Sequence, residues 1–202
     1  MPVFNDKHFS YDIDDGLWMW NRAQQLGIPL FAGSSLVVCW RKPYLEHPID
    51  CAMEDALIVS GGGPDGYHTL EALQCMVERR KGGETGVIAV TATRGAAVWE
   101  QMKKGSWDAG GWDPRLFEAC LSRSHMLSQG SENLGKYTHR YPSDAAIMEL
   151  VADPICYRLE YADGLKATML LMNGLVGDFN FAVRARGNNV RPFISTVVFS
   201  SL

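Results

Sequence analysis

The chain opens with PVFNDKHFSYDIDDGLWMWNRAQQLGIPLFAGS (residues 2–34), and this stretch predicts a strand, a helix and a second strand. Apolar residues recur every three or four positions between a capping Asp12 and a terminating Gly27: Ile13, Leu17, Trp20, Ala23 and Leu26. Short apolar runs flank the helix, so the two strands should be parallel and joined by a right-handed crossover. Such a unit leaves one face and both edges open, and it should pack against further sheet.

A different pattern follows a linker that contains Pro43 and Pro48. Strands are expected at residues 56–60, 87–93, 155–161, 165–172, 179–185 and 193–199, with helices at 68–80, 96–104 and 114–123. Runs of strands broken by helices are typical of an α+β fold, here a mainly antiparallel open sheet with helices on one face. The expected division is a strand–helix–strand unit at residues 1–36, a linker at 37–50 and an α+β domain at 51–202.

Composition excludes several classes of protein. The 202 residues carry 19 Lys and Arg against 23 Asp and Glu, a net charge of −4, so the chain is not expected to bind nucleic acid. No apolar run reaches the ~18 residues of a membrane span, and the first residues do not resemble a secretion signal. Five scattered cysteines without a Cys-x-x-Cys pair argue against a disulfide scaffold and a zinc cluster, so we expect a cytoplasmic protein with no metal site.

The segment GGGPDGYH (residues 61–68) is the most informative motif. It places His68 in the first turn of a helix, where the helix dipole favours the neutral imidazole, a form that can act as a base. Glu71 lies one turn later on the same helix face, so the two side chains can touch and form an acid–base site. The alternative is a structural histidine that is bonded to the backbone of a capping loop.

Two further segments could contribute to a site. Lys7 follows the first strand, and ligands of open α/β sheets bind beyond the carboxyl ends of their strands. Trp40 and Arg41 could stack on a ligand and bind a carboxylate. The alternatives are a solvated loop lysine and an arginine that holds a domain interface. Ser34 and Ser35 have no recognisable base nearby, and no nucleophile elbow occurs in the sequence.

Together these segments resemble the Gfo/Idh/MocA oxidoreductases, the family of glucose-fructose oxidoreductase and inositol dehydrogenase. The family has a Glu-Lys-Pro motif after a strand, where this chain has Asp6, Lys7 and His8. The helix, the short strand and Arg41 follow in the family's order. The family's Asp-x-Gly-x-His signature is similar to residues 61–71, in which Gly66 and His68 match.

The resemblance implies an oxidoreductase that uses NAD or NADP on a hydroxyl of a sugar-like or cyclitol-like small molecule. It implies Lys7 and His68 as catalytic residues, with His68 as the base, and Lys7 and Asp6 at the cofactor. The residues implied at the substrate are Asp65, Tyr67, Glu71, Trp40 and Arg41. It also implies a homo-oligomer that assembles through the C-terminal sheet.

The family's Gly-x-Gly-x-x-Gly turn does not occur in this sequence. We therefore expect residues 1–36 to be the last strand–helix–strand of a Rossmann domain whose larger part is absent, in a fragment or a shortened descendant. Two hypotheses follow. The chain is either part of a nicotinamide-dependent oxidoreductase or an inactive module that binds substrate or forms dimers.

Overall fold

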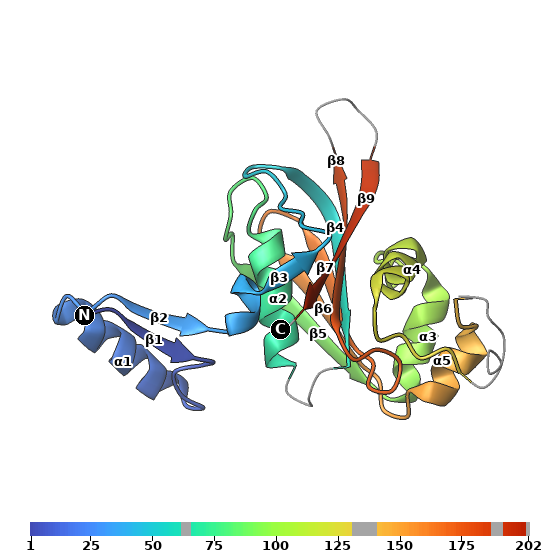
Figure 1. Ribbon diagram of the computed structural model, residues 1–202, viewed down its shortest axis with the longest axis horizontal. Helices are drawn as coiled ribbons and strands as arrows, with labels where there is room; N and C mark the ends of the chain where they lie inside the picture. Colours follow the sequence, from blue (N-terminus) through green and yellow to red (C-terminus); the bar gives the residue numbers. More distant parts are fainter. Residues whose placement is uncertain (62–65, 131–140, 187–191, 201–202) are drawn as a thin grey trace.

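The computed structural model describes residues 1–61, 66–130, 141–186 and 192–200. Within these residues, no helix is both long and apolar enough to cross a membrane. The chain begins with the strand–helix–strand unit that the sequence predicts: β1 (Val3–Asp6), α1 (Ile13–Gln25) and β2 (Leu30–Gly33). The two strands pair in parallel, from Val3 beside Leu30 to Asp6 beside Gly33. Figure 1 shows this unit extending away from the rest of the molecule.

The second part is an open seven-stranded sheet in the order β3-β9-β8-β4-β7-β6-β5. Its strands are β3 (Trp40–Lys42), β4 (Ala52–Ser60), β5 (Val87–Arg94), β6 (Ile155–Tyr161), β7 (Lys166–Leu171), β8 (Phe179–Arg186) and β9 (Pro192–Ser200). Every neighbouring pair is antiparallel except β4 and β7. The prediction of a mixed α and β chain with a mainly antiparallel open sheet is therefore confirmed.

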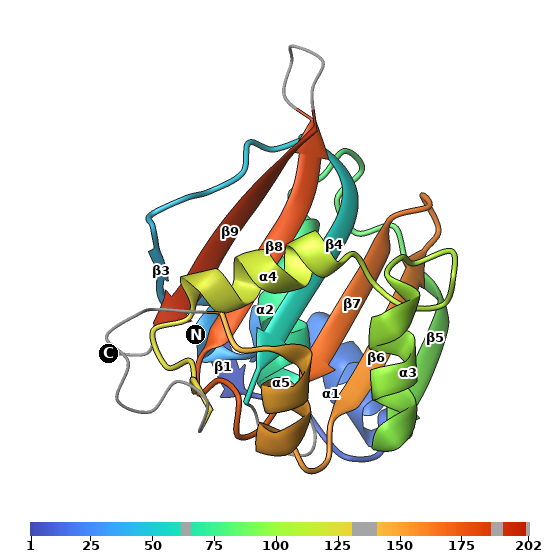
Figure 2. The ribbon, with the colours of Figure 1, turned by 90° about the vertical axis from the view of Figure 1, so that its right-hand side faces the viewer.

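Helices cover both faces of this sheet, so the expectation that they lie on one face is wrong. α2 (Tyr67–Val77) packs on one face, while α3 (Ala96–Lys104), α4 (Pro114–Arg123) and α5 (Asp144–Leu150) lie on the other (Figures 1 and 2). The physical reason lies in β4, whose residues 56–60 are all buried. Ala56 and Ile58 join the core beneath α2, and Leu57 and Val59 join the core beneath α4. A strand that is apolar on both sides needs cover on both sides.

The predicted linker is also more ordered than expected. Ser34 caps a short 3-10 helix, η1 (Ser35–Val38), and β3 follows it and pairs with β9 at the edge of the sheet. A strand of three residues next to Pro43 carries no alternating pattern long enough to be predicted.

The N-terminal unit leaves much of its apolar surface in solvent. Of the stripe on α1, Ala23 is buried, whereas Leu17 and Trp20 are 51% and 43% exposed. Phe4 and Phe31 are register partners on β1 and β2 and are 58% and 59% exposed. The prediction that this unit presents open apolar surface is confirmed.

Candidate functional site

The candidate site lies at the N-terminus of α2. Gly66 has a φ of 61°, the left-handed conformation that favours glycine, and it places Tyr67 and His68 in the first turn of the helix. The face of α2 that carries Thr69, Ala72 and Leu73 is buried, and the Thr69 hydroxyl lies 2.6 Å from that of Ser60 on β4. Because that face is fixed on the sheet, His68 and Glu71 are left half-buried beside the N-terminal unit.

Ser34 joins the two parts of the molecule at this helix. Its hydroxyl oxygen lies 2.6 Å from His68 Nδ1, and its backbone N–H donates to Glu71 Oε2 at 3.0 Å. The same hydroxyl oxygen accepts a hydrogen bond from the N–H of Leu36 at 3.0 Å. Ser34 is only 1% exposed, so these bonds form away from solvent. The three side chains of Ser34, His68 and Glu71 are called the seam site below.

This geometry couples the tautomer of His68 to Ser34. When Nδ1 carries the proton, it donates to the Ser34 hydroxyl, and Nε2 keeps a free lone pair that can accept a proton. When Ser34 donates instead, Nε2 carries the proton and can donate a hydrogen bond to a ligand. One carboxylate oxygen of Glu71 accepts the hydrogen bond from the Ser34 amide. Glu71 therefore holds the segment after β2 against α2 and also places a negative charge on the helix that carries the imidazole.

The segment after β1 reaches the same helix end. The rings of His8 and Tyr67 lie 5.7 Å apart, and those of Tyr67 and His68 lie 5.5 Å apart. Burial raises the pKa of the Tyr67 hydroxyl, and the charges of Glu71 and Asp6 raise it further. Asp6 is thus close enough to influence Tyr67, the neighbour of His68.

Lys7 adopts a φ of 83°, which residues other than glycine rarely adopt. Its backbone N–H and C=O both pair with Gly33, at 2.7 and 3.0 Å, and this bridge holds the loop in place. Its Nζ lies 3.6 Å from the Asp6 carboxylate, and both side chains are about half exposed. The backbone of the predicted lysine is thus fixed next to Ser34, while its side chain extends into solvent beside Asp6.

Trp40 and Arg41 lie further along α2. The Arg41 guanidinium donates to Glu46 and to the Val37 carbonyl, each at 3.0 Å, and lies 3.9 Å from Cys75 Sγ. Along the helix, Cys75 is about 10 Å beyond His68 and about 6 Å beyond Glu71. Arg41 thus joins η1 to α2, as the interface alternative predicts, although it also lines a cavity of about 400 Å³ with Trp40.

Of the predicted site residues, the structure brings together Tyr67, His68 and Glu71 at the start of α2. Asp6 is near enough to Tyr67 to raise its pKa, and Lys7 is joined to the residue before Ser34 through its backbone. Asp65 lies outside the described residues. Sequence reasoning missed Ser34, which we expected to have no base nearby, whereas His68 is its direct partner. The signal was its position after Gly33, at the carboxyl end of a parallel strand, where ligand sites of α/β sheets form.

The N-terminus of α1 does not fit the pyrophosphate of a dinucleotide. The Asp12 carboxylate accepts from the backbone N–H groups of Asp14 and Asp15 at 2.8 and 3.3 Å. These are the amides that would bind a phosphate group, and the three carboxylates of Asp12, Asp14 and Asp15 would repel it. The cofactor therefore stays an implication of the resemblance.

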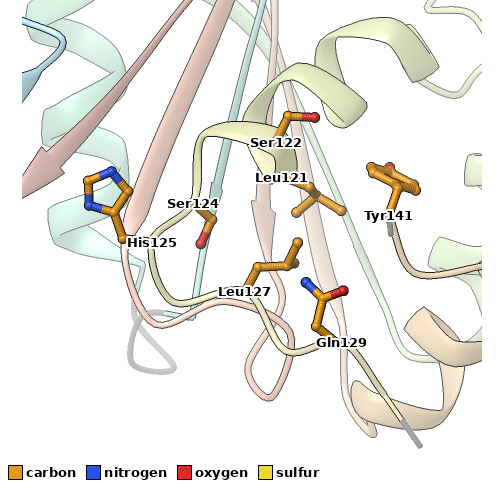
Figure 3. A pocket seen from close by; sticks show the side chains of 7 residues that line it. All are labelled: Leu121, Ser122, Ser124, His125, Leu127, Gln129 and Tyr141. Atoms are coloured by element: carbon orange, nitrogen blue, oxygen red, sulfur yellow. The ribbon is translucent and has the colours of Figure 1, made fainter. Parts of the chain in front are cut away.

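A second cavity of about 710 Å³ lies near α4 and is lined by Ser124, His125 and Tyr141 (Figure 3). Ser124 donates its hydroxyl to Asp178 at 2.6 Å, and the backbone N–H of His125 donates to the same carboxylate at 2.7 Å. Ser124 is therefore bound to a carboxylate rather than to an imidazole, and the group does not form a nucleophilic triad. Among the described residues, no cluster of His, Cys, Asp and Glu could hold a metal ion.

Searches of protein-family models, curated proteins and solved structures find no match to this chain.

Proposed function

We propose that the chain supplies the substrate half of an oxidoreductase similar to the Gfo/Idh/MocA family. In this proposal His68 exchanges a proton with a hydroxyl of a sugar-like or cyclitol-like molecule. The observation that carries the proposal is the 2.6 Å contact between Ser34 and His68 Nδ1. A buried hydroxyl that fixes one ring nitrogen leaves the other available for proton transfer, as general acid–base catalysis requires.

The residues around His68 support this role. Glu71 accepts from the Ser34 amide and so holds the hydroxyl that contacts the imidazole, and Lys7 would stabilise negative charge on a substrate oxygen. Glu71 thus acts on the partner of His68, and Lys7 would act on the substrate. NAD or NADP is implied by the resemblance alone, and no step is assigned to it here because α1 does not fit the pyrophosphate.

Ser34→Ala and Ser35→Ala form a matched pair that tests the proposal. Ser35 is the exposed neighbour, so its variant keeps the seam site intact. Long-range 1H–15N spectra of the full chain report the tautomer of His68. We expect Ser34→Ala to change the tautomer and Ser35→Ala to leave it unchanged. An unchanged His68 spectrum in Ser34→Ala would show that the hydroxyl does not control the imidazole.

Substrate binding is tested by titrating the full chain with a polyol such as myo-inositol and following the His68 ring resonances in the same spectra. We expect these resonances to shift saturably, and the exposed His125→Gln to leave the shift unchanged. A His68 ring that does not respond to the polyol would favour a structural histidine.

The second candidate function is an assembly or binding module without turnover. Exposed apolar surface favours this assembly function. Apolar residues of the N-terminal unit are exposed, and on the edge strand β5 Ile88 and Val90 are 65% and 59% exposed. An exposed edge strand of this kind can pair with another chain, so self-association through the C-terminal sheet belongs to this candidate. Self-association together with a His68 ring that does not respond to the polyol would favour it over the substrate half of an enzyme.

A further inference from the structure

A cavity of about 350 Å³ lies over the end of the central strands, on the face of the sheet opposite α2. Its floor is formed by Asp55 on β4 and Arg184 on β8, which are register partners. Asp55 alternates along β4 with Leu57, which belongs to the core beneath α4, so its side chain lies on that face. The connection between α3 and α4 supplies the wall and roof, including Trp107 and Asp113.

The two carboxylates that face Arg184 in this cavity are paired to different degrees. Asp113 accepts from Arg115 at 2.9 and 3.1 Å and also binds Arg184. Arg184 Nη2 lies 3.5 Å from Asp55 but donates to Asp113 at closer range. Asp55 is thus a weakly paired carboxylate whose side chain is 15% exposed at the cavity. Burial raises its pKa to about 6, against the attraction of Arg184 and with a contribution from the charge of Asp113.

Trp107 gives the cavity an apolar side chain, and two cationic side chains contact its ring. The guanidinium of Arg158 lies 4.0 Å from the centre of its ring and donates to its carbonyl at 2.5 Å. Lys166 Nζ lies 5.7 Å from the same ring. Contacts of this kind fix an indole without using its whole surface.

We propose that this cavity binds a small neutral polyhydroxyl molecule of monosaccharide or cyclitol size. A hydroxyl group can donate to the Asp55 carboxylate and accept from Arg184, and the C–H face of a ring can pack on Trp107. An anion would meet the carboxylates of Asp55, Asp108 and Asp113, and a cation would meet Arg115 and Arg184. The volume is in the range of small-molecule sites, from about 300 Å³ upward.

The cavity is separate from the seam site, because the sheet and its two cores lie between Asp55 and His68. The two proposals therefore stand or fall independently. A ligand here would occupy a second polyol site, which no residue of the proton-transfer site contacts.

Fluorine NMR of the full chain, labelled with 5-fluorotryptophan, tests the proposal. The chain has six tryptophans, and Trp107→Phe assigns the resonance at the cavity. We expect titration with myo-inositol or D-glucose to shift the Trp107 resonance saturably. Asp55→Asn and Arg184→Gln should each weaken the affinity about tenfold, whereas the exposed Asp144→Asn and the seam variant His68→Gln should leave it unchanged.

The other five tryptophan resonances report whether each variant is folded. The proposal is overturned if neither polyol shifts the Trp107 resonance of the folded protein. It is also overturned if the shift disappears in His68→Gln but persists in Asp55→Asn, because the polyol would then bind at the seam site. That second outcome would leave the proposed function standing.

Discussion

Asp55 holds a carboxylate where burial disfavours its charge, and this has a measurable effect on stability. Its pKa in the folded chain is about 6, against about 4 in an unfolded chain. The folded state therefore binds the proton more tightly, and stability falls as pH rises between these two values. We expect Asp55→Asn to raise the free energy of unfolding at neutral pH by about 3 kcal/mol, and the difference to disappear below about pH 4.

Urea unfolding of both proteins across this pH range is the measurement. A variant that is less stable than the wild type at neutral pH would show that the attraction of Arg184 outweighs the cost of burial. A gain of stability combined with weaker polyol binding would be typical of a residue kept for function.

Arg80 shows the opposite situation, a buried charge that is fully used. Its side chain is 3% exposed, binds Asp163 at 2.6 Å, donates to Thr85 and lies 4.6 Å from the centre of the Tyr161 ring. Arg80→Met leaves Asp163 without its partner, and we expect a loss of about 3 kcal/mol in urea unfolding. The control is Arg94→Met, whose exposed pair with Asp153 should contribute little. Equal effects of the two variants would contradict this prediction.

The same pair predicts a response to acid. The hydrogen bonds from Arg80 lower the pKa of Asp163 below its ordinary value. A lowered folded pKa gives stability that is present above the unfolded value of about 4 and is lost as pH falls through the folded value. Asp163→Asn should therefore flatten the acid limb of the stability curve measured by urea unfolding. If the acid side of the stability curve keeps its slope in Asp163→Asn, carboxylates other than Asp163 are responsible for the loss of stability in acid.

At the scale of an element, β2 ends at a position where only glycine fits well. Gly33 has a φ of 142°, and a Cβ there would lie 2.7 Å from Glu71 Oε2. We expect Gly33→Ala to displace Glu71 from the Ser34 amide, which would then exchange its hydrogen faster, and to cost about 1 kcal/mol. Gly16→Ala is the control, because Gly16 lies inside α1 and a Cβ there would make only an ordinary contact with Phe9 at 3.9 Å, so alanine should stabilise the helix. Slow exchange at Ser34 in Gly33→Ala would contradict the prediction.

The elements also show what sequence reasoning can reach. The periodicity of residues 12–27 and the apolar runs beside it predict β1, α1 and β2, because these signals are local. β3 depends on pairing between residues far apart in the chain, such as Arg41 with Phe199. The covering of both sheet faces has a local signal, the continuous apolar run of residues 56–59, which predicts a strand buried on both sides. The position of Ser34 at the end of a parallel strand indicates a site, but its pairing with His68, 34 residues later, depends on how the N-terminal unit meets α2.

At the scale of the molecule, the N-terminal unit determines how the chain behaves in solution. Its exposed Phe4 and Phe31 form a cross-strand pair on an open sheet face, and such a patch promotes association. We expect sedimentation velocity to show concentration-dependent oligomers, and the double variant Phe4→Thr, Phe31→Thr to reduce them. Val38→Thr, at a residue that is 83% exposed outside the unit, is the control. Oligomers unchanged by the double variant would exclude this face as the contact.

The Ser34–His68 hydrogen bond spans two parts of the chain, and thermodynamic reciprocity follows from that position. Any molecule that contacts both sides of the seam site binds more tightly when the N-terminal unit is docked, and it must favour docking by the same factor. A partner that holds the unit in place would therefore raise substrate affinity without touching substrate. The affinity of the site is thus a property of the whole molecule, set as much by what restrains β1 and β2 as by the imidazole itself.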